Sequence, residues 1–261
     1  MTVRSRLLKM CQSGLAMAWV LAAPAQALEE TVLRFCYDPY PPYTLGDGGI
    51  PSGGLKVQLL EAVTGRIEGV SAVVVLLPWQ RCQAQAQTGE TDGILPLFKS
   101  AARESYLAFT EGTFLQTNSL WYNMRRYPGG LMPGEGYSEV SQLRLGMVNA
   151  SIIDEEMEAA FERHNPIVRT GDAASLMQML LFGQLDLIAL DDAVGWHQVV
   201  RHGWQDRIGR IASPVSSRYS HFGLSKASGA DAYLDAFNRA ISELRADGSI
   251  TEILRSFDFT Q

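Results

Sequence analysis

The chain has 261 residues, of which 46% are hydrophobic and 19% charged, and its formal net charge is −6. This composition is that of an ordinary globular protein, and it excludes a disordered chain and a membrane-embedded one. An acidic chain is also a poor match to a phosphate backbone, which calls for clustered Lys and Arg, so we expect no nucleic-acid partner.

The N-terminal residues have the layout of a cleavable secretory signal peptide. Three cations precede an apolar stretch over residues 14–23, and Ala25-Gln26-Ala27 then places small residues at the two positions that a signal peptidase inspects. The apolar stretch is shorter than the roughly 20 residues that span a bilayer, and Pro24 interrupts it, which argues against a membrane anchor. Cleavage after Ala27 leaves 19 Lys and Arg against 28 Asp and Glu, a formal charge of −9. We therefore expect a secreted, periplasmic protein.

Strand and helix patterns alternate through the next part of the chain. We predict strands over residues 32–37, 72–77 and 92–95, and helices over residues 55–67 and 79–88. This βαβαβ order predicts helices on both faces of a parallel sheet. The glycine-rich residues 46–54 lack the Lys-Ser/Thr ending of a phosphate-binding loop, so we expect a flexible turn there.

Two cysteines remain in the predicted mature chain, Cys36 and Cys82. Cys36 ends the first predicted strand, and Cys82 lies in the first turn of the helix after the second strand, so the two can be close in a βαβ unit. An even pair in an oxidising compartment favours a disulfide. Two buried free thiols are the alternative.

A Pro/Gly-rich stretch over residues 128–136 separates the first α/β series from a second one. The predicted elements of this second part are an extended run at 118–123, strands at 145–148, 167–168 and 185–190, helices at 152–164, 173–182 and 191–202, a further extended run at 218–224, and helices at 230–246 and 250–257. The chain crosses between the two series twice, near residues 118–127 and 213–222, which permits a hinge. We predict a discontinuous lobe 1 over residues 28–120 and 222–261, and lobe 2 over residues 121–221.

A search for catalytic and metal-binding motifs finds none. The four histidines are scattered, no HExxH, clustered Cys/His or EF-hand pattern occurs, and no GxSxG motif surrounds a serine. We expect no catalytic residue, no metal and no cofactor.

Aromatic side chains follow the predicted strands and are candidates for a ligand site. Prolines stiffen the loop over residues 38–43, so Tyr40 or Tyr43 is either a wall over a ligand or part of the loop's own packing. Trp79 begins a helix directly after a strand, and it either lines the same crevice or is buried beneath its helix. Open α/β sheets bind ligands at such strand ends.

Several segments spread over the whole mature chain have a characteristic order and spacing. They are residues 38–43, Gly53-Gly54-Leu55, Pro78-Trp79, residues 89–94, residues 103–110, Leu145-Gly146-Met147-Val148, residues 180–191 and Asp247-Gly248-Ser249-Ile250. This order resembles the family 3 extracellular solute-binding proteins, the periplasmic receptors of polar amino-acid ABC importers. The resemblance implies a periplasmic-binding-protein-like (type II) α/β fold, with two lobes, each a mixed sheet flanked by helices, and two hinge strands.

The resemblance also implies a clamp for a zwitterion. Arg103 matches the arginine that receives the ligand carboxylate, which suits the bidentate geometry of a guanidinium. Asp191 matches the acidic residue that receives the α-ammonium, and Ser151 lies in the loop that holds the carboxylate at a helix N-terminus. The alternatives are an exposed charge at a helix start for Arg103 and a plain N-cap for Asp191. Asp192 is a second candidate for that cap, which would leave Asp191 free.

One segment departs from the family pattern. Pro96, Leu97 and Phe98 stand where typical amino-acid binders have small hydroxyl residues, and the segment is one residue shorter. The site is therefore more aromatic, with Phe98 as a candidate contact, or its ligand is not a zwitterion.

We predict a monomeric receptor that captures a small polar solute, an amino acid or a related compound, and presents it to an ABC permease in the inner membrane. Two alternatives remain open. The first is a cyclohexadienyl dehydratase-like enzyme on the same fold, with Glu111 or Glu155 as a candidate general acid. The second is a soluble ligand-sensing partner of a membrane receptor.

Overall fold

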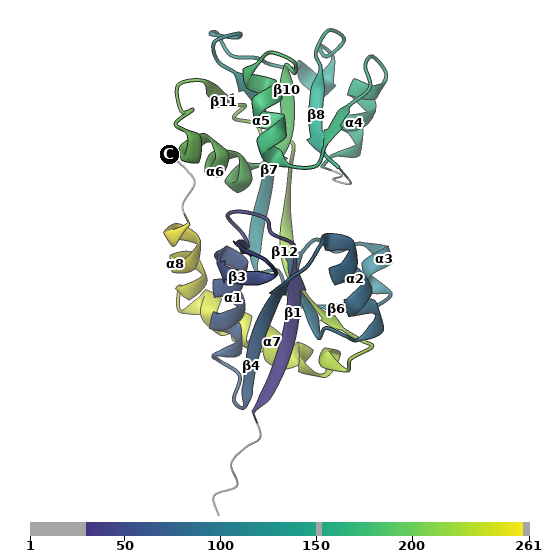
Figure 1. Cartoon of the computed structure of the whole chain (residues 1–261), viewed down its shortest axis with the longest axis vertical. Helices are drawn as coiled ribbons and strands as arrows, with labels where there is room; N and C mark the ends of the chain where they lie inside the picture. Colours follow the sequence, from purple (N-terminus) through teal and green to yellow (C-terminus); the bar gives the residue numbers. More distant parts are fainter. Residues whose placement is uncertain (1–29, 150–152, 258–261) are drawn as a thin grey trace, which may run out of the picture.

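Two long antiparallel strands connect a lower and an upper α/β lobe in Figure 1. The structure is a computed structural model that describes residues 30–149 and 153–257. The first part of the chain and its last two helices form the lower lobe, and the middle of the chain forms the upper lobe (Figure 1). This arrangement agrees with the two crossings expected from the sequence.

Three parallel strands form the centre of the lower lobe, in the order β4, β1, β5. All five residues of β5 are buried, as expected of a strand covered on both faces. The lower-lobe elements are β1 (Thr31–Tyr37), α1 (Leu55–Thr64), β4 (Val70–Leu76), α2 (Trp79–Thr88), β5 (Gly93–Leu97), α3 (Ala101–Glu104), β6 (Leu107–Phe109), the 3-10 helix η2 (Ala230–Tyr233), α7 (Leu234–Ala246) and α8 (Ser249–Ser256). Helices α1, α7 and α8 pack together, whereas α2 packs separately against β1 and β5.

The crossing strands are β7 (Phe114–Asn123) and β12 (Ser216–Ser225). They pair from Ser216 opposite Asn118 to Ser220 opposite Phe114. Beyond this stretch β7 pairs with upper-lobe strands and β12 with lower-lobe strands, so one sheet runs through both lobes in the order β4-β1-β5-β12-β7-β10-β8-β9. The predicted lobe limits at residues 120–121 and 221–222 fall within these strands, and they remain a prediction.

The upper lobe repeats the α/β pattern. Its elements are the 3-10 helix η1 (Glu135–Tyr137), β8 (Leu145–Val148), α4 (Glu155–Glu162), β9 (Val168–Thr170), α5 (Ala173–Leu181), β10 (Leu187–Asp191), α6 (Asp192–His202) and β11 (Ile208–Arg210). The predicted helix over residues 152–164 begins only at Glu155, because the side chain of Asp154 caps it by accepting from the backbone N–H of Met157 at 2.8 Å.

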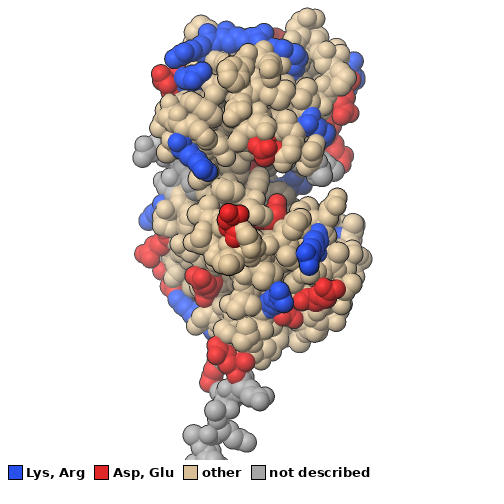
Figure 2. Space-filling model, in the orientation of Figure 1, with Lys and Arg blue, Asp and Glu red and all other residues tan. Residues whose placement is uncertain are grey.

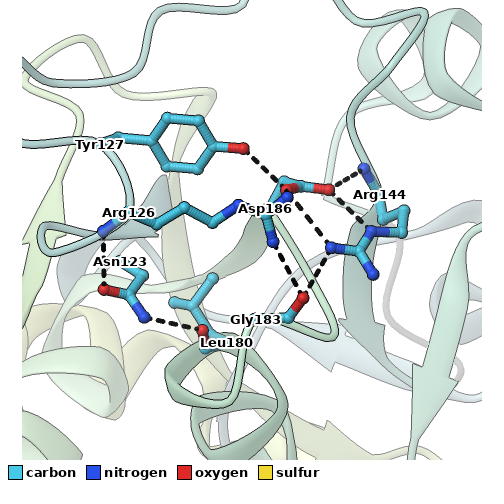
Figure 3. Close-up of polar contacts among 7 residues, drawn as sticks. All are labelled: Asn123, Arg126, Tyr127, Arg144, Leu180, Gly183 and Asp186. Carbon is cyan, nitrogen blue, oxygen red and sulfur yellow. Dashed lines mark hydrogen bonds and ion pairs between the residues drawn. The ribbon is translucent and has the colours of Figure 1, made fainter.

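A buried carboxylate fastens the upper lobe just before β10 (Figure 3). Asp186 accepts from the backbone N–H and the Nε of Arg144, both at 2.9 Å, and from the hydroxyl of Tyr127 at 2.7 Å. Arg126 forms a further ion pair with it at 3.0 Å. These contacts join the end of β7, the start of β8 and the turn before β10.

The lower lobe shows whether Cys36 and Cys82 are bonded and what the glycine-rich residues 46–54 form. The Cys36–Cys82 disulfide is present, with the two Cα atoms 5.6 Å apart, and it ties the end of β1 to the first turn of α2. The flexible turn expected at residues 46–54 is instead a hairpin of β2 (Leu45–Asp47) and β3 (Ile50–Gly53). Gly48 and Gly49 have φ of 58° and 85°, the positive values that a two-residue hairpin turn requires.

Within residues 30–149 and 153–257, the helices are all too short or too polar to cross a membrane. The predicted signal peptide lies outside the described residues.

Candidate ligand-binding site

The candidate side chains of the lower lobe follow β1, β4 and β5, at the edge of the sheet where the carboxyl ends of parallel strands meet. Asp191 ends β10 of the upper lobe. The molecular surface is hollowed between the lobes, and both cationic and acidic side chains are visible in the hollow (Figure 2).

A hydrogen bond between the lobes joins Tyr43 to Asp191. The Tyr43 hydroxyl lies 2.8 Å from Oδ1 and 2.9 Å from Oδ2 of the carboxylate. Gln116 of β7 donates to Oδ2 at 3.2 Å, and the backbone N–H of Val194 donates to Oδ1 at 3.1 Å. Asp191 is only 4% exposed. Burial raises its pKa, and the hydrogen bonds that it accepts oppose this effect.

Asp191 is also the N-cap of α6, through its contact with the Val194 N–H. The alternative in which Asp192 is the cap is wrong. Asp192 is the first residue of the helix, and its carboxylate pairs with Arg210 of β11.

The two tyrosines of the loop after β1 stack on each other. The ring centroids of Tyr40 and Tyr43 are 5.6 Å apart, and Phe114 of β7 packs against Tyr43 at 5.7 Å. Thr44 fixes the loop: its hydroxyl donates to the backbone oxygen of Asp38 at 2.6 Å and accepts from the Tyr40 N–H at 2.9 Å. Tyr43 is therefore held where it reaches the upper lobe.

A buried lysine in the same cluster was missed by the sequence analysis. Lys56, the second residue of α1, is 1% exposed, and its Nζ donates to the Tyr37 hydroxyl at 2.7 Å. The same Nζ lies 4.0 Å from the ring centroid of Tyr37 and 4.9 Å from that of Tyr43. Burial lowers the pKa of Lys56 to about 7, although the charges of Asp38 and Asp191 act in the opposite direction.

Helical periodicity contained a signal for this lysine. Residues three, four and seven positions after Lys56 are Leu59, Leu60 and Val63, all buried. Lys56 is therefore on the helix face that packs against the core, and a lysine at such a position is either at the edge of the core or buried in it.

A second group of candidates forms around Arg103. Its Nη1 donates to the backbone oxygen of Phe98 at 2.8 Å, and its guanidinium carbon lies 5.3 Å from the ring centroid of Trp79. Trp79 in turn packs against Tyr37 at 5.4 Å, which links this group to the tyrosine cluster. The ring of Phe98 lies beneath Arg218 of β12, with 4.5 Å between the guanidinium carbon and the ring centroid.

Arg103 and Asp191 share the surroundings of Tyr37 without touching. Burial raises the pKa of Tyr37, and Arg103 lowers it while Asp191 raises it. No hydrogen bond or ion pair joins Arg103 to Asp191 among the described residues. Ser151 lies outside the described residues.

A cavity of about 250 Å³ meets this region at Tyr43 and Phe114. Its wall also includes Trp196 of α6 and Leu254 of α8, and it contains none of Trp79, Phe98 and Arg103. We therefore place the candidate site at the charged and aromatic cluster and not in this cavity. In the described part of the chain, no three His, Cys, Asp or Glu side chains gather as a metal ion would require.

A family model described as bacterial extracellular solute-binding proteins, family 3, matches residues 33–261. The chain belongs to this family. The match includes every described candidate residue, and the description agrees with the resemblance inferred from the sequence.

Solved structures share the family 3 fold at low sequence identity. A histidine kinase sensor domain with similarity to periplasmic binding proteins has a TM-score of 0.70 at 17% identity, covering 88% of this chain and 96% of that one. The arginine-, lysine-, histidine-binding protein ArtJ from Geobacillus stearothermophilus has a TM-score of 0.67 at 20% identity, with the same coverage. The ancestral amino-acid-binding protein AncCDT-1, a precursor of cyclohexadienyl dehydratase, has a TM-score of 0.67 at 16% identity, covering 87% and 94%.

These identities establish the fold alone, because sites change within a fold more readily than the fold itself. A comparison with curated protein sequences found no match.

The segment that departs from the family 3 pattern lies against the arginine. Pro96 and Leu97 are buried in β5, and the backbone oxygen of Phe98 holds the Arg103 guanidinium. One N–H of Arg103 therefore donates to a backbone carbonyl of this segment. Residues 96–99 contain no hydroxyl side chain, and the first one is Ser100.

Proposed function

We propose that the protein is a periplasmic receptor that captures a small polar solute between its two lobes and delivers it to an ABC-type permease. The observation that carries the proposal is the convergence of Arg103 and Asp191, from opposite lobes, on one aromatic cluster around Tyr37. Family membership supports the binding of a solute, and the neighbouring structures include substrate-binding proteins of amino-acid ABC transporters.

Closure of the lobes follows from where the contacts lie. A ligand carboxylate on Arg103 is held by the lower lobe, and its other groups reach the end of β10 in the upper lobe. Such a ligand makes more contacts when the lobes are closed, and this difference in affinity shifts the population toward the closed form. Trp79 and Tyr40 add apolar contact area.

The proposal includes the location and the assembly state. Cleavage after Ala27 would release a mature chain into the periplasm as a monomer, in agreement with the extracellular character of the family. Residues 149–151, which include Ser151, are proposed to add donors to the ligand carboxylate.

A thermal-shift screen of the mature protein against amino acids, polyamines, organic acids and opines tests the proposal. A specific ligand raises the melting temperature by mass action. The Arg103→Ala variant should then bind the identified ligand at least about tenfold more weakly in isothermal titration, because the carboxylate loses its partner. Arg239→Ala removes an exposed arginine of α7 and should bind as wild type does. Equal affinity of Arg103→Ala and wild type would contradict the assignment of Arg103.

We propose binding without turnover. The two carboxylates considered for a general acid lie elsewhere: Glu111 contacts Ser242 and Arg245 of α7, and Glu155 is exposed at the start of α4. The likeness to a sensor domain and to a dehydratase precursor carries the fold alone, and neither function is proposed for this chain.

A further inference from the structure

Asp191 has little hydrogen-bonding capacity left for a ligand ammonium. A carboxylate offers about four lone-pair sites. Three donors of the protein use these sites: the single Tyr43 O–H, whose oxygen lies 2.8 Å from Oδ1 and 2.9 Å from Oδ2, the Val194 N–H on Oδ1 at 3.1 Å, and the Gln116 amide on Oδ2 at 3.2 Å. All of these donors are neutral, and the positive end of the α6 dipole supplies further stabilisation. Neutral donors of the protein therefore offset part of the cost of burying the Asp191 charge.

Lys56 supplies a cation of the protein's own inside the tyrosine cluster. Its Nζ donates one hydrogen bond, to Tyr37, and faces the rings of Tyr37 and Tyr43. Asp38, the residue after β1, interacts with this ammonium electrostatically: burial raises the pKa of Asp38, and the charge of Lys56 lowers it. A cation of the protein itself thus offsets part of the cost of the Asp38 charge.

Arg103 is the charge that remains without an opposite charge. A guanidinium has five N–H donors. Those of Arg103 make one hydrogen bond, to the backbone oxygen of Phe98, while the group lies over the face of Trp79. Among residues 30–149 and 153–257 it forms no salt bridge. The site therefore offers unused donors at Arg103, whereas most acceptor sites of Asp191 are already used.

We infer that the site takes an organic carboxylate that carries no α-ammonium group, rather than an amino acid. This inference rests on the proposed receptor function and specifies its ligand. Arg103 holds the carboxylate, Trp79 and Tyr40 contact the carbon skeleton, and Lys56 disfavours a ligand ammonium by like-charge repulsion.

Matched ligand pairs that differ mainly in the α-ammonium test the inference. We would titrate the mature protein with succinate and L-aspartate, with 3-phenylpropionate and L-phenylalanine, and with 4-methylpentanoate and L-leucine. In the pair whose skeleton fits, wild type should bind the acid at least about tenfold more tightly than the amino acid, a difference of about 1.4 kcal/mol.

The Lys56→Met variant should reduce this preference by about tenfold or reverse it. Without the ammonium, Asp38 has no internal counter-charge and can accept an amino group from the ligand. Lys226→Met is the matched control, since that lysine contacts the backbone of Glu104 on the surface of the same lobe and should leave the preference unchanged. Thermal unfolding checks that both variants are folded. Lys56→Gln, which keeps a polar end for Tyr37, replaces Lys56→Met if the latter does not fold.

Each result separates the ligand class from the receptor function. If wild type binds the amino acid of a pair more tightly than the acid, the inference is overturned and the receptor function stands. A folded Lys56 variant with an unchanged preference overturns it as well. Failure of wild type to bind any small solute, in these pairs and in the thermal-shift screen, would overturn the proposed function together with the inference.

Discussion

Two buried aspartates at opposite ends of β10 have opposite environments. Asp186, just before the strand, receives a tyrosine hydroxyl and two arginines, and these contacts hold its pKa below the usual value despite burial (Figure 3). Asp191, at the last position of the strand, receives a tyrosine hydroxyl, an amide and a backbone N–H but no cation, and burial raises its pKa.

The origin of the partners explains the difference. Asp186 is bound by side chains of its own lobe, so its contacts persist whatever the lobes do relative to each other. The hydroxyl on Asp191 comes from Tyr43 of the other lobe. Asp186 therefore stabilises the upper lobe, whereas Asp191 lies where movement of the lobes relative to each other changes its hydrogen-bond partners.

Replacing Asp186 should have the largest effect on stability. Asp186→Asn leaves Arg144 and Arg126 without their shared acceptor charge, and we expect a loss of about 3 kcal/mol in the free energy of unfolding. Urea unfolding measures it. Ligand affinity should stay within about twofold of wild type, since the contacts of Asp186 are confined to the upper lobe; a loss of binding with unchanged stability would contradict the structural role.

Acid titration should separate the two aspartates by sign. The pKa of Asp186 is lowered in the folded state, so its stabilisation is present above the ordinary pKa of about 3.9 and is lost as the pH falls. The pKa of Asp191 is raised, so the folded state binds its proton first, and acidification favours folding at this site.

Urea unfolding from about pH 7 to about pH 3 tests this difference. The stability advantage of wild type over Asp186→Asn should shrink toward low pH, whereas the stability of wild type relative to Asp191→Asn should grow. Parallel pH profiles for the two pairs would contradict the comparison.

Removing the hydroxyl of Tyr43 should have the smallest effect. Tyr43→Phe deletes one hydrogen bond to a carboxylate while keeping the ring on Tyr40 and Phe114, so we expect a loss of about 1 kcal/mol. In the Asp191→Asn background the same change should cost less, because the two groups interact directly. Equal costs in both backgrounds would show that the contact between the lobes contributes nothing.

Hydrophobic periodicity and turn residues along the sequence predicted most of the individual helices and strands. The helix over residues 79–88 and the strand over residues 145–148 match α2 and β8 residue by residue, and the cysteine positions predicted the disulfide. The hairpin was missed although Gly48-Gly49 is its signal, because the surrounding strands are short and have no buried residue that would give them a core-facing pattern.

The site was predicted in its members but not in their contacts. Family resemblance selected Arg103 and Asp191. The side chains that donate hydrogen bonds to Asp191, however, are Tyr43 and Gln116, which are 148 and 75 positions away in the chain. No local pattern encodes such contacts. The burial of Lys56 likewise depends on the loop after β1 that packs over it.

A structure of the mature protein with its highest-affinity ligand bound tests the central claim most directly. The account predicts a ligand carboxylate within hydrogen-bond distance of the Arg103 guanidinium, with the rest of the ligand between the two lobes and against the aromatic cluster of Trp79 and Tyr40. A ligand bound away from Arg103, or one held by a single lobe, would contradict it.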